Sequence, residues 1–492
     1  MAEHAAQFGS GAESKNAAEK AASVRISMPL LLLSWIFLLF LQHHLAVNSL
    51  DERTAAEGMI ASAQAGDMLH QVASLLLGAL GVFLLRGSRS LSLSRGIKPI
   101  LVMYAAWVCV SAFWADQPFV TARRQLGFGM EALFCAGVVA RFESWARGAF
   151  IAWLAGMNLA IGFANQIYRG GFDFLGVGGR FAGTVDTNVQ GATLAAAAIL
   201  VLWGLPGVKR LRRIGLAVAA AAFLVFLLLT RSRTSLLALT AALAFSALLS
   251  IARRWYRKPT AATIALAFFA ASIAVVGALC PDWIQRTSAT VSHAMREERD
   301  VGDVSELTGR TVIWEECLKW AAQRPVLGFG FGSFWTAERV EAITEDMHWT
   351  AAHAHSAYLD EYLALGLPGA VLFAALLLGC LICASAKFLR GGDEYGPWAA
   401  LIVFFCIHGT TESLSILPTF PGFALTITVL SIALRSRAST NGYAAIPSQL
   451  EARENAITEY DSAPVGSLVL RLEPWRSDAL GERVGMPIRT RF

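Results

Sequence analysis

The chain has 492 residues, of which 55% are hydrophobic and 16% charged, and its mean hydropathy is +0.51. Soluble domains carry roughly 25% charged residues, so this composition argues against a soluble fold. The net charge of +5 is small for this length. It favours contact with anionic lipids and argues against nucleic acid as a partner.

Apolar runs of about 20 residues, the length that crosses the hydrocarbon core of a bilayer, recur along most of the chain. They predict an all-α polytopic integral membrane protein with about 12 transmembrane helices, because a helix satisfies its own backbone hydrogen bonds in lipid. The expected spans lie near residues 28–46, 68–85, 99–114, 126–140, 148–166, 190–206, 214–230, 234–251, 261–280, 357–386, 397–412 and 417–435.

The first apolar run follows a segment of mixed charge and is not closed by a small-residue cleavage pattern, so we expect it to stay as a membrane anchor. The polar end of the chain, with scattered Pro, Gly and charges, is expected to contribute little to function. The predicted organisation is a cytoplasmic N-terminal segment (1–27), transmembrane helices 1–9 (28–280), a large periplasmic loop between spans 9 and 10 (281–356), transmembrane helices 10–12 (357–435) and a cytoplasmic tail (436–492).

The basic residues of the short loops predict the orientation, because cytoplasmic loops carry an excess of Lys and Arg. One face holds most of them, in the stretches 86–98, 141–147, 209–213, 253–258 and 387–390. The other face holds only Arg53, Arg123, Arg124, Arg169, Arg180, Arg231 and Arg233. The first face is therefore predicted to be cytoplasmic, together with both termini, and the long loop to lie outside.

The long loop is the one predicted segment outside the bilayer that is large enough to build structure of its own. Within it, Thr308 precedes an expected helix over residues 309–324, and Pro325 prevents that helix from continuing. The apolar residues of this helix share one face: Ile313, Cys317, Trp320 and Ala321. This pattern predicts an amphipathic helix that lies on the membrane surface.

Glycines alternate with aromatic residues in the next segment, Gly328-Phe-Gly-Phe-Gly-Ser-Phe-Trp335. Glycine permits tight turns beside bulky rings. The spacing and the surrounding sequence differ from those of a dinucleotide-binding fingerprint. The Phe and Trp side chains of this segment either are buried within the loop or pack against sugar faces or a prenyl chain.

The seven cysteines fall mainly inside apolar runs, where cysteine acts as a small hydrophobic residue. Cys380-x-x-Cys383 lies in mid-membrane, and we interpret it as packing and not as a redox motif. Cys280 and Cys317, at or in the outward loop, are one candidate disulfide pair.

Three arginines on the predicted outward face depart from the positive-inside pattern. Arg231 and Arg233 fill a very short turn between two spans, and Arg180 lies in a glycine-rich segment. A guanidinium binds phosphate in a bidentate manner and keeps its charge when desolvated, so these residues suit a lipid-linked phosphate or diphosphate. The alternative is that they only reach the lipid headgroups. Arg310, at the head of the loop helix, is a candidate for the same cluster.

Two histidines, His353 and His355, lie at the end of the loop, just before the chain re-enters the membrane. Neither a third ligand at convincing spacing nor an Asp-x-Asp element accompanies them, so no metal site is predicted. A neutral imidazole beside a cluster of arginines has its pKa lowered, which suits a general base better than an acid. The alternative is a pair of surface histidines without a catalytic role.

The end of the loop resembles a known motif. His355-Ser356 is followed, after nine residues, by Gly366-Leu-Pro-Gly369. This pattern is similar to the histidine motif of the O-antigen ligase and polysaccharide polymerase superfamily, in which His is followed by Asn, Ser or Gln and later by Gly-x-x-Gly. Ser356 stands where the family often has Asn.

Further elements extend the resemblance over about residues 100 to 435. They are Gly179-Arg-Phe-Ala-Gly-Thr-Val-Asp-Thr-Asn188, Arg231-Ser-Arg-Thr-Ser235, Gly309-Arg-Thr-Val-Ile-Trp314 and Arg324-Pro-Val-Leu-Gly-Phe-Gly330. Three stretches look most like the exopolysaccharide-polymerase branch, which assembles succinoglycan-like repeats: residues 330–335, His353-Ala-His-Ser-Ala-Tyr-Leu-Asp360 and Thr411-Glu412-Ser413-Leu414.

The resemblance implies an inverting, metal-independent glycosyltransferase without a cofactor, on the periplasmic side of a bacterial inner membrane. Its donor would be an oligosaccharide linked to undecaprenyl diphosphate. Arg180, Arg231 and Arg233 would hold the diphosphate, with Arg310 either binding phosphate or holding the loop down. His355 would accept the proton of the acceptor hydroxyl, and His353 would orient it. Glu412 is predicted as a supporting partner on the last outward turn.

Three functions compete at this stage. The leading hypothesis is polymerisation of lipid-linked repeat units, with a glycan acceptor, membrane lipids and a chain-length regulator as candidate partners. A ligase that transfers a finished glycan to lipid A core or to a protein needs the same groups. A precursor transporter is disfavoured, because the sequence has no visible repeat and its ionisable groups cluster at the outward boundary and not in mid-membrane.

Overall fold

The computed structural model describes residues 68–86, 91–168, 180–206, 208–255, 305–344, 353–414 and 419–436. Several predicted segments lie outside these ranges, namely the N-terminal segment 1–27, the spans 28–46 and 261–280, parts of the loop and the tail after Ser436. Cys280, and with it the candidate disulfide to Cys317, also lies outside them.

Helices account for most of the described residues, in agreement with the predicted fold class. In chain order they are α3 (Met68–Leu85), α4 (Lys98–Val110), the 3-10 turn η1 (Ser111–Phe113), α5 (Pro118–Arg141), α6 (Ser144–Tyr168), α7 (Thr187–Gly204), α8 (Arg210–Thr230), α9 (Arg233–Trp255), α12 (Ser305–Ala321), α13 (Ala337–Thr344), α14 (Ala357–Leu389), the 3-10 turn η3 (Asp393–Tyr395), α15 (Gly396–His408) and α16 (Phe420–Ala433).

Five described helices are long and apolar enough to cross a membrane: α6, α7, α8, α9 and α14. Shorter apolar helices cover His70–Leu85, Lys98–Phe113 and Phe420–Ala433. These helices fit an all-α membrane protein, whereas the count of about 12 spans stays a prediction. The short apolar run 126–140 belongs to the longer helix α5. This helix can begin at Pro118, because the N–H that proline lacks has no intrahelical partner in the first turn.

A small sheet qualifies the all-α prediction. Strand β1 (Leu91–Leu93) pairs antiparallel with β2 (Leu434–Ser436), so that Leu93 lies opposite Leu434. Three residues are too few to show the alternation that marks a strand in a sequence. The pair ties the segment after α3 to the end of α16.

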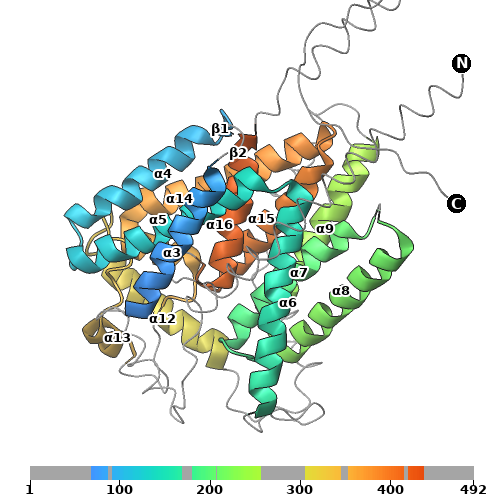
Figure 1. Cartoon of the computed structure of the whole chain (residues 1–492). Coiled ribbons are helices and arrows are strands. Elements are labelled where there is room, and N and C mark those ends of the chain that lie inside the picture. The colour runs from blue at the N-terminus through green and yellow to red at the C-terminus, as the bar shows by residue number, and fades with distance from the viewer. Residues whose placement is uncertain are drawn as a thin grey trace, which may run out of the picture. The chain divides into compact units, whose positions relative to one another are not determined.

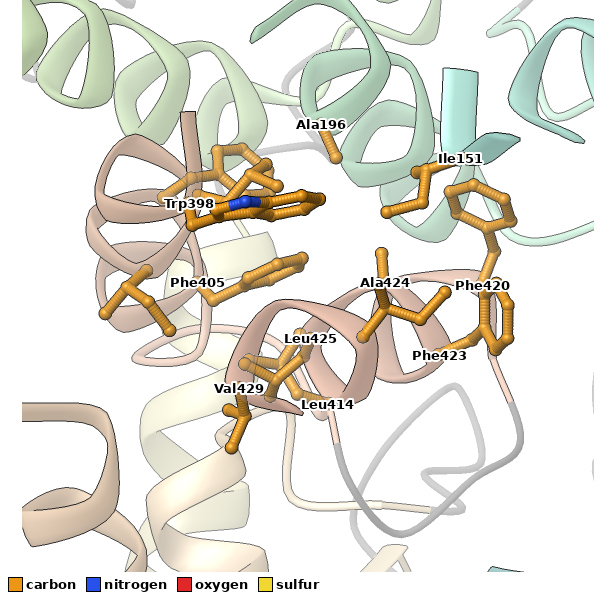
Figure 2. Packing of buried hydrophobic residues seen from close by; sticks show 14 of the residues in the cluster. Ile151, Ala196, Trp398, Phe405, Leu414, Phe420, Phe423, Ala424, Leu425 and Val429 are labelled. Carbon is orange, nitrogen blue, oxygen red and sulfur yellow. The ribbon is translucent and has the colours of Figure 1, made fainter. Parts of the chain in front are cut away.

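Helix α7 lies at the centre of the core, because every residue from Gln190 to Val201 is buried. Small residues fill this stretch and allow the neighbouring helices to approach closely, as is common between membrane helices. Figure 2 shows Ala196 of α7 and Ile151 of α6 facing Trp398 of α15 and Ala424 of α16. The helices that carry the functional groups therefore share one rigid apolar core.

The two described helices of the long loop, α12 and α13, lie together at the end of the helices opposite to the β1–β2 pair (Figure 1). Helix α12 contacts α13 and the beginning of α14. It begins at Ser305 and ends at Ala321, which is close to the predicted 309–324. That this end of the helices faces the periplasm stays a prediction.

Candidate active site

The loop docks onto a break in helix α14. Gly366 has φ 68° and ψ −174°, so the helix loses its regular hydrogen bonds there. The glycine-aromatic segment replaces them, since the backbone N–H groups of Phe329 and Gly330 donate to Leu363 O (2.9 Å) and Ala364 O (2.8 Å). On the other side of the break, Leu367 N donates to Pro325 O at 2.8 Å. Irregular backbone at membrane depth is tolerated only where such partners satisfy it.

The geometry also explains why the motif needs glycine at position 366. A Cβ atom there would lie 2.1 Å from Val326 O, and the positive φ is strained for any other residue. The Gly-x-x-Gly part of the histidine motif therefore serves docking of the loop. Through this docking, the loop holds the histidines at the start of α14.

The aromatic side chains of the loop are buried and form its own core. Phe329, Phe334 and Trp335 pack with Ile313 and Cys317 of α12. Of the two roles considered for these rings, the structure shows burial. The apolar face of α12 packs against this core, and α12 contacts α14, whereas its position on the membrane surface stays a prediction.

A carboxylate that the sequence did not single out anchors the loop to the turn before α5. Asp116 forms ion pairs with Arg324 (2.6 Å) and with Arg339. The guanidinium of Arg339 also lies over the Phe329 ring, 4.5 Å from its centroid. The loop is thus tied to the membrane helices by charge as well as by backbone bonds.

His353 and His355 lie directly before α14, whose first turn is capped by Ser356. Their ring centroids are 4.0 Å apart. His355 Nδ1 lies 3.4 Å from Glu412 Oε2, and its side chain is 18% exposed. An imidazole whose Nδ1–H donates to a carboxylate keeps its Nε2 lone pair for accepting a proton.

Burial and, to a smaller extent, the adjacent His355 ring lower the pKa of His353 to about 4. The sequence predicted a lowered histidine pKa, although it assigned the cause to the arginines. The carboxylates of Asp360, Glu412 and Asp186 act in the opposite direction. His353 is therefore neutral at physiological pH.

Glu412 joins the base to the loop helix. One oxygen lies 2.5 Å from Arg310 Nη2 and the other faces His355, while the Glu412 side chain is only 6% exposed. Arg310 is likewise largely buried, at 11%. Of the two roles predicted for Arg310, this ion pair matches holding the loop in place, and it brings the predicted partner Glu412 beside His355.

Arg231 and Arg233 lie on the turn between α8 and α9, which hydroxyl groups tie to its neighbours. Arg231 ends α8 with φ 53°. Thr234 Oγ1 accepts a hydrogen bond from Thr411 Oγ1 at 3.0 Å. Ser235 Oγ lies 3.2 Å from Nε2 of the buried His408. These two contacts place the arginine turn, residues 230–235, against the turn that carries Glu412.

Arg180 belongs to the same region. Its Nε donates to Thr230 O at 3.1 Å and its Nη2 to Asn188 Oδ1 at 3.2 Å. The structure therefore brings Arg180 to the arginine turn, and that turn to Glu412 and His355. Segments that are far apart in the sequence meet at one place.

Backbone strain marks two of the predicted residues. Among non-glycine residues in the described ranges, only Arg231 (φ 53°) and His355 (φ 48°) have positive φ. Such conformations are sparse for residues other than glycine and concentrate at functional sites. One strained residue carries the candidate base and the other a candidate phosphate ligand.

The sequence analysis missed three residues of the site: Asp360, Ser413 and His408. All three are polar groups inside or beside apolar helices, and the sequence signal that could have found them is that polarity. Asp360 is fully buried and His408 nearly so. Within the described residues, no group of three or more His, Cys, Asp or Glu side chains is placed to hold a metal ion.

Comparison with known proteins identifies the central part of this arrangement. Residues 218–374 match the O-antigen ligase family. The matched range contains Arg231, Arg233, Arg310, the two histidines and the Gly-x-x-Gly break, whereas Arg180 and Glu412 lie outside it. No curated protein matches the chain. With its apolar helices the chain is a multi-pass membrane protein, and residues 218–374 form an O-antigen ligase domain, which is found in membrane enzymes that act on glycans.

Proposed function

We propose that this protein polymerises exopolysaccharide or O-antigen repeat units on the periplasmic face of a bacterial inner membrane. The donor is a glycan linked to undecaprenyl diphosphate and the acceptor is a second glycan. The observation that carries the proposal is the juxtaposition of a histidine oriented by Glu412 with a turn that presents two arginines.

The reaction follows from these groups. The acceptor hydroxyl oxygen attacks the anomeric carbon from the face opposite to the diphosphate, and its proton passes to His355 Nε2. The bond between the anomeric carbon and the diphosphate oxygen breaks, which inverts the configuration. Arg180, Arg231 and Arg233 stabilise the negative charge that grows on the leaving diphosphate.

The proposal is tested with purified protein and lipid-linked repeat units extracted from cells that lack this chain. We expect longer glycans with the native protein and a loss of about 100-fold or more in kcat for His355→Asn, in line with the effect of a general base. Asn tolerates positive φ and retains a polar group near Glu412, but it lacks Nε2. Unchanged kcat in this variant would refute His355 as the base.

A ligase is the second candidate, because the matched family is that of O-antigen ligases. The same preparation distinguishes the two functions. Glycosylation of added lipid A core or protein, without elongation of the repeat units alone, favours the ligase. Undiminished polymer export in cells that carry His355→Asn would favour the transporter.

A further inference from the structure

Asp360 lies in the first turn of α14, three residues after Ala357, and has no exposed surface. Burying a carboxylate is costly unless hydrogen bonds satisfy it. Its Oδ1 accepts from Trp335 Nε1 and from Ala354 N, both at 3.1 Å. Its Oδ2 accepts from the hydroxyl of Ser413. The three donors come from three separate segments of the chain.

Each of these donors adjoins part of the site. Ala354 lies between the two histidines, so its N–H bond to Asp360 fixes the peptide between His353 and Ala354, one residue before His355, whose φ is 48°. Ser413 follows Glu412, the residue that faces His355 Nδ1. Ser413 Oγ also lies 3.2 Å from His353 Nδ1. One carboxylate thus connects the backbone of the base with the turn that orients its ring.

We propose that Asp360 is a positioning residue, which acts through Ala354 and Ser413 to hold His355 and Glu412 in the arrangement needed for proton transfer. The inference rests on the proposed role of His355 as the base. Asp360 touches neither substrate nor diphosphate in this role. Its loss therefore affects the chemical step more than the binding of the donor.

Asp360→Asn isolates this effect, because the amide has nearly the same volume as the carboxylate. The Asn oxygen still accepts from Trp335 and Ala354, which forces the amide N–H₂ toward Ser413 Oγ. The hydrogen bond to Ser413 is thereby reversed, since the hydroxyl now accepts where it donated. Ser413→Ala removes the same bond from the other side and is the milder change for folding.

Glu361→Gln is the matched control. Glu361 is the next residue of α14 and is equally buried, but its Oε1 accepts from Tyr104 OH at 3.0 Å, away from the histidines. A general sensitivity of α14 to loss of a buried carboxylate would lower kcat in this variant too. If Asp360 acts by positioning, the kcat of Glu361→Gln should not fall.

The kinetic constants of each variant are measured with lipid-linked repeat units beside the native protein and His355→Asn. We expect kcat to fall about 10-fold or more in Asp360→Asn and in Ser413→Ala, with KM for the donor changed less than about 3-fold. The double variant should be no slower than the slower single variant, because both substitutions disrupt the same native hydrogen bond between Ser413 and Asp360. Glu361→Gln should stay within about 2-fold of the native kcat.

Native kcat in Ser413→Ala, or multiplied losses in the double variant, would overturn the inference. So would a raised KM at unchanged kcat. If Asp360→Asn fails to fold, Ser413→Ala decides alone. If His355→Asn is inactive while Asp360→Asn and Ser413→Ala match the native protein, only the positioning role falls. If His355→Asn is fully active, the proposed base falls and this inference with it.

Discussion

The two halves of the site are supported by different chemistry. His355 is positioned by buried carboxylates, since Glu412 faces its ring and Asp360 accepts a hydrogen bond from the backbone N–H of the preceding residue, Ala354. The arginine turn is positioned by neutral groups, through the hydroxyls of Thr234 and Ser235. Hydroxyl groups thus tie the arginine turn to its neighbours, whereas two carboxylates hold the histidine region.

The difference has an energetic consequence. Loss of a neutral hydrogen bond costs about 1 kcal/mol, whereas loss of one partner of a buried ion pair leaves the other charge uncompensated and costs about 3 to 5 kcal/mol. Supports on the histidine side should therefore be more sensitive to substitution than those on the arginine side. Two substitutions test this contrast and a third tests the pH dependence of the histidine side; they are taken from the largest expected effect to the smallest.

Glu412→Gln should have the largest effect. The amide keeps the size of the side chain but removes the charge that faces both Arg310 and His355. We expect kcat to fall about 100-fold, as for the loss of an oriented base, together with a lowered unfolding temperature in detergent. Glu315→Gln is the control, because Glu315 is exposed on the same loop helix and pairs with the exposed Lys319. Native kcat in Glu412→Gln would contradict the contrast.

Arg231→Lys should have an intermediate effect. Lysine keeps the positive charge and adopts the same positive φ as arginine at about equal cost, but it contacts a phosphate as a single point charge. We expect KM for the lipid-linked donor to rise about 10-fold with a smaller change in unfolding temperature. Arg210→Lys, at the exposed other end of α8, should leave KM unchanged. An unchanged KM for the donor in Arg231→Lys would show that Arg231 is not part of the diphosphate site.

His353→Asn should have the smallest effect and concerns pH. Because the pKa of His353 is lowered to about 4, the unfolded chain binds a proton there more readily than the folded protein. Stability contributed by the neutral ring is therefore lost as the pH falls from about 6.5 toward 4. The unfolding temperature of the native protein should drop over this range, and that of the variant should drop less. An equal drop in both would show that His353 is not the titrating group.

Much of the fold was visible in the sequence because membrane helices leave a strong pattern. The described runs 190–206, 214–230 and 234–251 correspond to α7, α8 and α9. Helix α12 and its apolar face were also predicted, since Ile313 and Cys317 are spaced at helical period and are buried. The protein core that this face packs against could not be predicted, because an apolar face has the same periodicity beside lipid and beside protein.

The site was visible in part. Arg231 and Arg233 stood out because they depart from the positive-inside pattern, and His355 because of its spacing to the Gly-x-x-Gly element. Asp360 and Ser413 did not stand out, since single polar residues at helix ends are common and their roles depend on partners that are distant in sequence. The hydrogen bonds of Asp360 to Trp335 and Ser413 span 25 and 53 positions.

The sequence by itself determined the chemical groups and the membrane character of the chain, because residue type, hydropathy and short spacings are local properties. Only the tertiary structure decided how these groups act together. It placed Glu412 between Arg310 and His355, turned Gly366 into the docking point of the loop and joined the arginine turn to the end of α15. Each of these contacts links segments that are far apart in the chain, and their geometry follows from how the helices pack.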